Sequence, residues 1–77
     1  MVAYVGASVQ SAAIGGTVVR VVSTTDCHIA FGANPTATAT SMFLPAKAPE
    51  YFICSSTDKV AVIQDAAGGN LSVTPAI

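Results

Sequence analysis

The side chains with the greatest capacity for chemistry lie together in one short segment, Asp26-Cys27-His28. In an extended strand, Asp26 and His28 share one face and Cys27 points to the other. A zinc site needs three or four converging ligands, whereas this chain has one His, two Cys and four acidic residues spread along its length. We therefore expect no metal site: Asp26 would cap a turn, and His28 would lie on the surface or at an interface.

The sequence contains no recognisable motif for a nucleophile or for phosphate binding. A nucleophile elbow has the pattern Gly-x-Ser-x-Gly, and the segment Gly6-Ala7-Ser8 lacks the second glycine. The glycine pairs Gly15-Gly16 and Gly68-Gly69 stand outside any phosphate-loop pattern. We expect both pairs to form turns, where glycine accepts positive φ at little cost. The chain is accordingly predicted to be no enzyme and to bind no cofactor.

The two cysteines, Cys27 and Cys54, form no Cys-x-x-Cys motif. Neither a zinc ribbon nor a thioredoxin-type redox site is therefore indicated. We expect two reduced thiols that pack as small hydrophobic groups. A disulfide between them is the alternative, because both residues fall in predicted strands.

The composition indicates that much of the surface is covered by other protein. Charged residues make up 9% of the 77-residue chain, against about 25% in an ordinary globular domain. The net charge is −1 and the hydrophobic fraction is 52%, which excludes a basic nucleic-acid-binding surface and a disordered tail. The uncharged runs are diluted by Gly, Ser, Thr and Pro, so we expect no membrane span.

The hydrophobic residues are chiefly Val, Ile, Phe and Tyr, which favour strands. Short strands at spacings near ten residues predict a single all-β domain, a small antiparallel β-sandwich or barrel of six or seven strands. Residues 17–77 would form the β core and 1–16 an extended N-terminal arm or short strand. The Thr-Ala tract 36–41 is expected to be an exposed loop. The strands are predicted at 2–9, 17–23, 27–31, 42–44, 50–54, 59–64 and 71–74.

Alternation with a period of two residues predicts which side chains form the core. The predicted core residues are Val19, Val21, Cys27, Ile29, Phe31, Leu44, Phe52, Val60, Val62, Leu71 and Val73.

A second set of residues is predicted to contact other subunits. The N-terminal arm has little bulk for a core but carries apolar anchors, and Arg20 lies on the same strand face as two valines. The candidate interface residues are Val2, Tyr4, Val5, Val9, Arg20, His28 and Tyr51.

The stretch from Asp26 to Gln64 resembles small, β-rich virion structural proteins of tailed bacteriophages. The resemblance rests on His28-Ile29-Ala30-Phe31-Gly32 with Asn34-Pro35-Thr36-Ala37, Met42-x-Leu44-Pro45-Ala46, Pro49-Glu50-Tyr51-Phe52 and Asp58-Lys59-Val60-Ala61-Val62. It implies a capsid decoration (cement) protein in the phage head, assembled in the host cytoplasm. The implied partners are further copies of the chain, as a homotrimer, and the major capsid protein, with no nucleic acid or membrane.

Two other functions remain open from the sequence. The chain could be another virion component, such as a tail, baseplate or spike subunit. The other is a non-viral β-sandwich binding module, for example one that recognises carbohydrate, although sugar sites usually display exposed aromatics and the chain contains no Trp.

Overall fold

The protein is all-β. The computed structural model describes residues 1–76, and Ile77, the last residue of the predicted β core, lies outside the described residues. Across residues 1–76 no helix is present, and so none that could cross a membrane. The strands are β1 (Val2–Tyr4), β2 (Val9–Gln10), β3 (Val18–Ser23), β4 (Cys27–Gly32), β5 (Met42–Leu44), β6 (Glu50–Ile53), β7 (Lys59–Gln64) and β8 (Gly69–Pro75).

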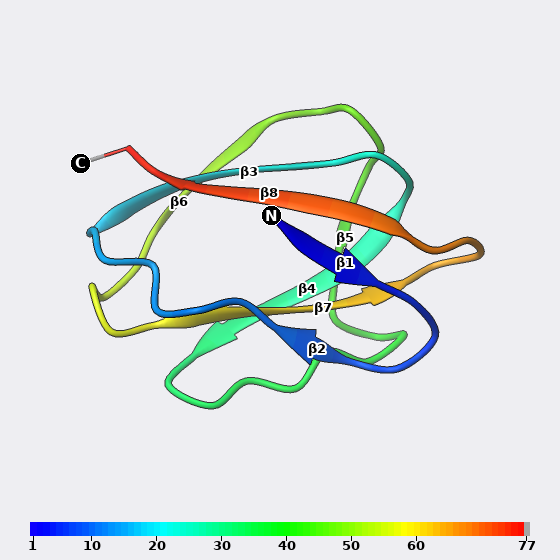
Figure 1. The fold of residues 1–77 in the computed structure, drawn as a ribbon, viewed down its shortest axis with the longest axis horizontal. Helices are drawn as coiled ribbons and strands as arrows, with labels where there is room; N and C mark the ends of the chain where they lie inside the picture. The colour runs from blue at the N-terminus through cyan, green and yellow to red at the C-terminus, as the bar shows by residue number, and fades with distance from the viewer. Residues whose placement is uncertain (77) are drawn as a thin grey trace.

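The strands form two four-stranded antiparallel sheets in a sandwich-like arrangement (Figure 1). Sheet A has the strand order β1-β8-β3-β6 and sheet B has the order β2-β7-β4-β5. Strands β6 and β5 are therefore the outer strands at one side of the two sheets, and β1 and β2 are the outer strands at the other. The all-β, antiparallel part of the prediction is confirmed, with eight strands where six or seven were expected.

The core between the sheets follows the predicted alternation. In β3 the burial alternates strictly, with Val19 and Val21 fully buried and their neighbours half-buried. Each fully buried Val, Leu or Ile side chain contributes about 1.5–3 kcal/mol through removal of apolar surface from water. The predicted core residues Val19, Val21, Cys27, Ile29, Leu44, Val60, Val62 and Leu71 are buried, and Phe31, Phe52 and Val73 pack against them partly buried.

The N-terminal segment forms two short strands, which is the alternative to the extended arm that the sequence left open. Strand β1 pairs with β8 and β2 pairs with β7, so residues 1–16 add an outer strand to each sheet. Tyr4 and Ile14 belong to the core. The Tyr4 hydroxyl donates a hydrogen bond to the Thr25 carbonyl at 2.8 Å. An aromatic side chain of this size stabilises the fold most when its ring is buried and its hydroxyl is bonded.

The Gly68-Gly69 pair also differs from its expected role. Among the described residues, positive φ occurs in glycine at Gly15 and Gly32 only, so the pair is not required for a left-handed turn. A Cβ at Gly69 would instead meet the Thr25 hydroxyl at 2.5 Å and the Tyr4 hydroxyl at 2.9 Å. Glycine is therefore needed here because the chain passes so close to the hydroxyl groups that hold the N-terminal segment.

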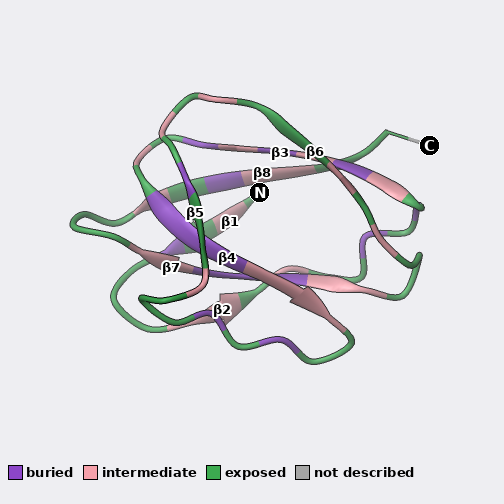
Figure 2. Ribbon diagram, turned by 180° about the vertical axis from the view of Figure 1, so that it is seen from behind, coloured by how far each residue is buried: buried purple, intermediate pink, exposed green. Residues whose placement is uncertain are grey.

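The connection from β4 to β5, residues 33–41, lies over the outer side of sheet B; we call it the cover segment. Gln10 on β2 donates hydrogen bonds through Nε2 to Asn34 Oδ1 and the Pro35 carbonyl, each at 2.8 Å. The Ala37 amide donates to Ser8 Oγ at 2.9 Å. Figure 2 shows the buried stretches within this connection. The loop expected to be exposed is thus exposed only in part, since Ala37 is buried.

Candidate interaction surface

The outer face of sheet A carries large side chains that no other segment covers among the described residues. Val18, Arg20 and Val22 alternate with the buried residues of β3 and are half-buried. Their neighbours on β6 are Ile53, opposite Val18, and Tyr51, opposite Arg20. Ile53 is 91% exposed and Tyr51 62% exposed. Within this group of five, Arg20 is the one charged residue, so the part of the sheet A outer face formed by β3 and β6 is largely apolar, whereas β8 places the polar Thr74 and Ser72 opposite Arg20 and Val22.

A shallow hollow of about 360 Å³ lies at one end of this face, where the sheet A outer face meets the N-terminus and the turn before β6. Met1, Val22 and Pro49 supply its apolar lining, and Arg20 and Lys47 supply two positive charges. Lys47 has a left-handed backbone with φ 59°, which is uncommon for a residue with a Cβ. Its amide donates to the Ser23 carbonyl at 2.7 Å, which fixes Lys47 at the rim. The hollow therefore suits an apolar group that carries a carboxylate.

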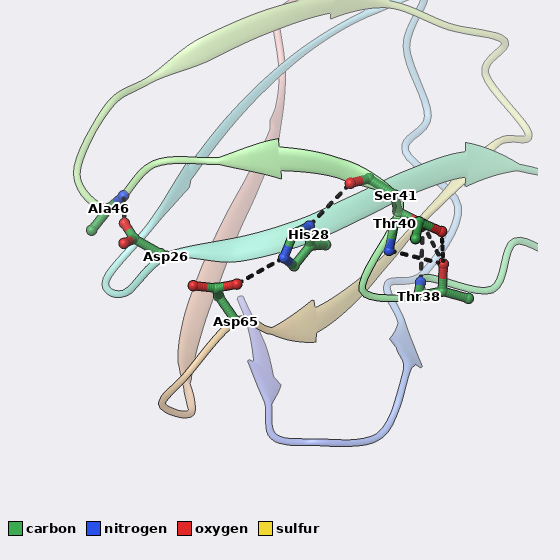
Figure 3. A network of polar contacts seen from close by, with 7 residues as sticks. All are labelled: Asp26, His28, Thr38, Thr40, Ser41, Ala46 and Asp65. Atoms are coloured by element: carbon green, nitrogen blue, oxygen red, sulfur yellow. Dashed lines mark hydrogen bonds and ion pairs between the residues drawn. The ribbon is translucent and has the colours of Figure 1, made fainter.

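On the opposite side of the molecule, His28 is held between two acceptors (Figure 3). Its Nε2 lies 2.9 Å from Asp65 Oδ1 and its Nδ1 lies 3.0 Å from the Ser41 carbonyl. The hydrogen bond to Asp65, then the one to Ser41, raises the pKa of His28 above its usual value. Phe43 packs edge-on against the ring at 5.5 Å. Because both ring nitrogens face acceptors, the protonated imidazolium satisfies the site best.

This arrangement links the sheet to the cover segment. Ser41 meets His28 through its backbone carbonyl, so no hydroxyl is activated there. The carboxylate of Asp26 accepts a hydrogen bond from the Ala46 amide at 2.7 Å, as a turn-capping residue does. Among the described residues, no three His, Cys, Asp or Glu side chains gather as metal ligands.

Both cysteines are free thiols. Cys27 lies in the core, where burial raises its pKa. Cys54 follows β6, and its Sγ donates to the Gly16 carbonyl at 3.3 Å. The alternative of a disulfide between them is not what the structure shows.

The candidate interface residues do not lie together on one surface. Arg20 and Tyr51 lie together as register partners on the sheet A outer face. Tyr4 is 1% exposed and His28 is also buried, so neither is accessible on the surface of the subunit. Val2 and Val9 pack partly buried against the core, and Val5 is exposed on the turn between β1 and β2.

Sequence reasoning missed Ile53 as a surface residue, although its place two residues after Tyr51 put it on the same face. It also missed Lys47, whose position depends on the left-handed turn. Comparison of the chain with known protein families, with curated proteins and with solved structures yields no match.

Proposed function

We propose that this chain is a structural protein of the tailed-phage virion, a decoration (cement) protein that binds the major capsid protein and stabilises the head. The observation that carries the proposal is the part of the sheet A outer face formed by β3 and β6, where large apolar side chains lie beside the single charge of Arg20. Large exposed apolar patches mark sites of protein contact. The resemblance of residues 26–64 to phage virion proteins supplies the kind of partner.

A cement protein acts by mass action, since it binds the assembled shell and not the separated subunits. A small subunit can do this with few charges, because its neighbours cover the surface that would otherwise need them. Several copies bound to neighbouring capsid subunits would also gain from avidity. The chain has three Lys or Arg and four Asp or Glu residues, which fits such a subunit.

The hollow indicates what the capsid protein would present to this face. Arg20 and Lys47 are the charged residues of its lining, so the complementary group is a carboxylate among apolar side chains. Charge reversal by Arg20→Glu is expected to weaken binding to heads at least tenfold. The matched control Lys59→Glu lies on β7 in sheet B, and it should bind like the unaltered chain in the same co-sedimentation assay.

The copy number of the chain in purified virions tests the function itself. Quantitative mass spectrometry of intact particles should find the chain at a number comparable to the major capsid protein. A few copies per particle would show that the chain is a tail, baseplate or spike component and not a cement protein. Absence of the chain from virions would overturn the virion proposal altogether.

A further inference from the structure

Strand β6 is an open edge of sheet A, and its outward backbone groups are known from the register. Along an antiparallel strand, the residues that bond to the neighbouring strand alternate with residues whose N–H and C=O point away from it. The backbone amide of Cys54 donates to the Thr17 carbonyl at 2.9 Å. Because hydrogen-bonded residues recur at every second position, the next residues of β6 that bond to β3 are Phe52, opposite Val19, and Glu50, opposite Val21. Tyr51 and Ile53 therefore direct their backbone groups away from the sheet.

Apolar side chains flank this open edge on both faces. Tyr51 and Ile53 project from the outer face and are largely exposed. On the inner face, Phe52 is partly buried and its ring lies 5.1 Å from that of Phe31. Proteins commonly protect open edges with Lys, Pro or bulges. Within β6 the single charged residue is Glu50 at its start, so the rest of the edge is unprotected.

We propose that a second copy of this chain pairs with β6 in antiparallel orientation, joining the two A sheets into one eight-stranded sheet. The self-complementary register places Phe52 opposite Phe52 of the second copy at the two-fold axis. Tyr51 then lies opposite Ile53 of the second copy, and each such pair exchanges two backbone hydrogen bonds. Both pairs also bring an aromatic ring beside a β-branched side chain, a favourable cross-strand combination.

The charges of the chain are compatible with this register. Glu50 would lie opposite Cys54 of the second copy, so the two Glu50 residues stand four positions apart along the strands, about 13 Å. The two Arg20 residues are separated by three strand spacings, about 14 Å. Both separations exceed the screening length of about 8 Å at physiological ionic strength, so like charges do not oppose the pairing.

Among the four outermost strands, β6 is the longest, with 4 residues against 3 in β1, 2 in β2 and 3 in β5. Tyr51 and Ile53 are 62% and 91% exposed, so even their complete coverage would bury well under the roughly 800 Å² per partner of a standard interface. The pair should therefore be reversible in solution. A two-fold pair is a dimer, in place of the homotrimer implied by the resemblance, and it leaves uncovered the outward side chains of β3, which are Val18, Arg20 and Val22.

Sedimentation equilibrium of the full chain tests the pairing over micromolar to millimolar concentrations. The unaltered chain should form dimers, and Ile53→Lys, which places a charge on the edge, should raise the dissociation constant at least tenfold. Thr57→Lys, in the exposed turn before β7, is the matched control and should dimerise normally. A monomer at all concentrations, a trimer, or an Ile53→Lys variant that dimerises like the unaltered chain would overturn the pairing.

A cross-link tests the register independently of stability. In a Cys54→Ser background, Phe52→Cys should form an intermolecular disulfide under mild oxidation, because two-fold-related residues of a non-hydrogen-bonded pair lie about 4.5 Å apart. Thr57→Cys in the same background should not. Failure of Phe52→Cys to cross-link in a folded dimer would overturn this register. The pairing does not depend on the proposed function. If the chain forms the dimer but is absent from virions, only the proposed function is overturned. If the chain is bound in virions as a monomer, only the pairing is overturned.

Discussion

The two outer faces of this molecule are built from equivalent alternating strands, yet they differ in what covers them. On sheet B, Ala61 points outward beside Gln10 and Ala30 but is fully buried, because the cover segment lies over it. On sheet A, Ile53 points outward and is 91% exposed. The same alternation thus yields one face that the chain itself covers and one face that it leaves exposed.

The difference is also one of chemistry. The covered face is fastened by polar contacts, including His28 with Ser41 and Gln10 with Pro35. The open face carries large apolar side chains and one charged residue, Arg20. The scarcity of charge therefore has a different explanation on each face. The sheet B outer face needs few charges because the cover segment lies over it, and under the proposed function the sheet A outer face needs few because a partner would cover it.

The largest expected effect comes from replacing an isoleucine beneath the covered sheet. Ile29→Ala should lower the free energy of unfolding by about 2–5 kcal/mol, because Ile29 is buried in the core and the substitution leaves a cavity. Chemical denaturation monitored by far-UV circular dichroism measures the change. A loss below about 1 kcal/mol would show that the interior of sheet B is less closely packed than described.

The cover segment itself should be the next most sensitive. Ala37→Asp places a charge at a position that is 2% exposed, and it should cost about 1–3 kcal/mol or detach the segment from the sheet. Hydrogen exchange at the amides of β2 and β7 would report the detachment. Ala39→Asp, at an exposed position of the same segment, is the control, and an equal effect there would contradict the difference in burial.

A smaller effect concerns the pH dependence of the His28 contact. Because the pKa of His28 is raised in the folded state, its stabilisation is fully present below the unfolded pKa of about 6.5 and is lost as pH rises through the folded pKa. The loss should be below about 1 kcal/mol, since Asp65 is half exposed.

Histidine occurs once in the chain, so its titration can be followed by a single set of imidazole NMR signals. The midpoint should lie above that of Asp65→Asn, which removes the carboxylate that raises the pKa. Equal midpoints in the two proteins would show that Asp65 does not hold the imidazolium.

The smallest effect on stability is expected from a substitution on the sheet A outer face. Ile53→Ala should change the unfolding free energy of the dilute monomer by no more than about 0.5 kcal/mol, although it is the same substitution as Ile29→Ala. A loss of unfolding free energy as large as that of Ile29→Ala would mean that Ile53 is buried within the subunit and that the sheet A outer face is covered.

Much of the fold was predictable from residue alternation alone. Val19 and Val21 are buried as predicted because β-branched residues repeat every second position along β3. The short N-terminal strands β1 and β2 were harder to predict, since three and two residues carry little periodic signal. Tyr4 was misplaced for this reason: its burial depends on hydroxyl partners at Thr25, 21 positions away.

The residues of the candidate site were likewise predictable only in part. Arg20 and Tyr51 were both singled out in the sequence, but only the pairing of β3 with β6 brings them together. The partner of His28 could not be found from spacing, because Asp65 lies 37 residues further along the chain, whereas the nearby Asp26 is bonded to Ala46.

The sequence by itself determined that this chain forms strands, which side chains of the long strands turn inward, and that charge is too scarce to cover an ordinary surface. These properties depend on the local backbone period and on composition. Only the tertiary structure decided which outer face is closed and which strand edge is open. Those outcomes depend on where residues 33–41 lie and on the register between distant strands, and such long-range contacts leave no local pattern in the sequence.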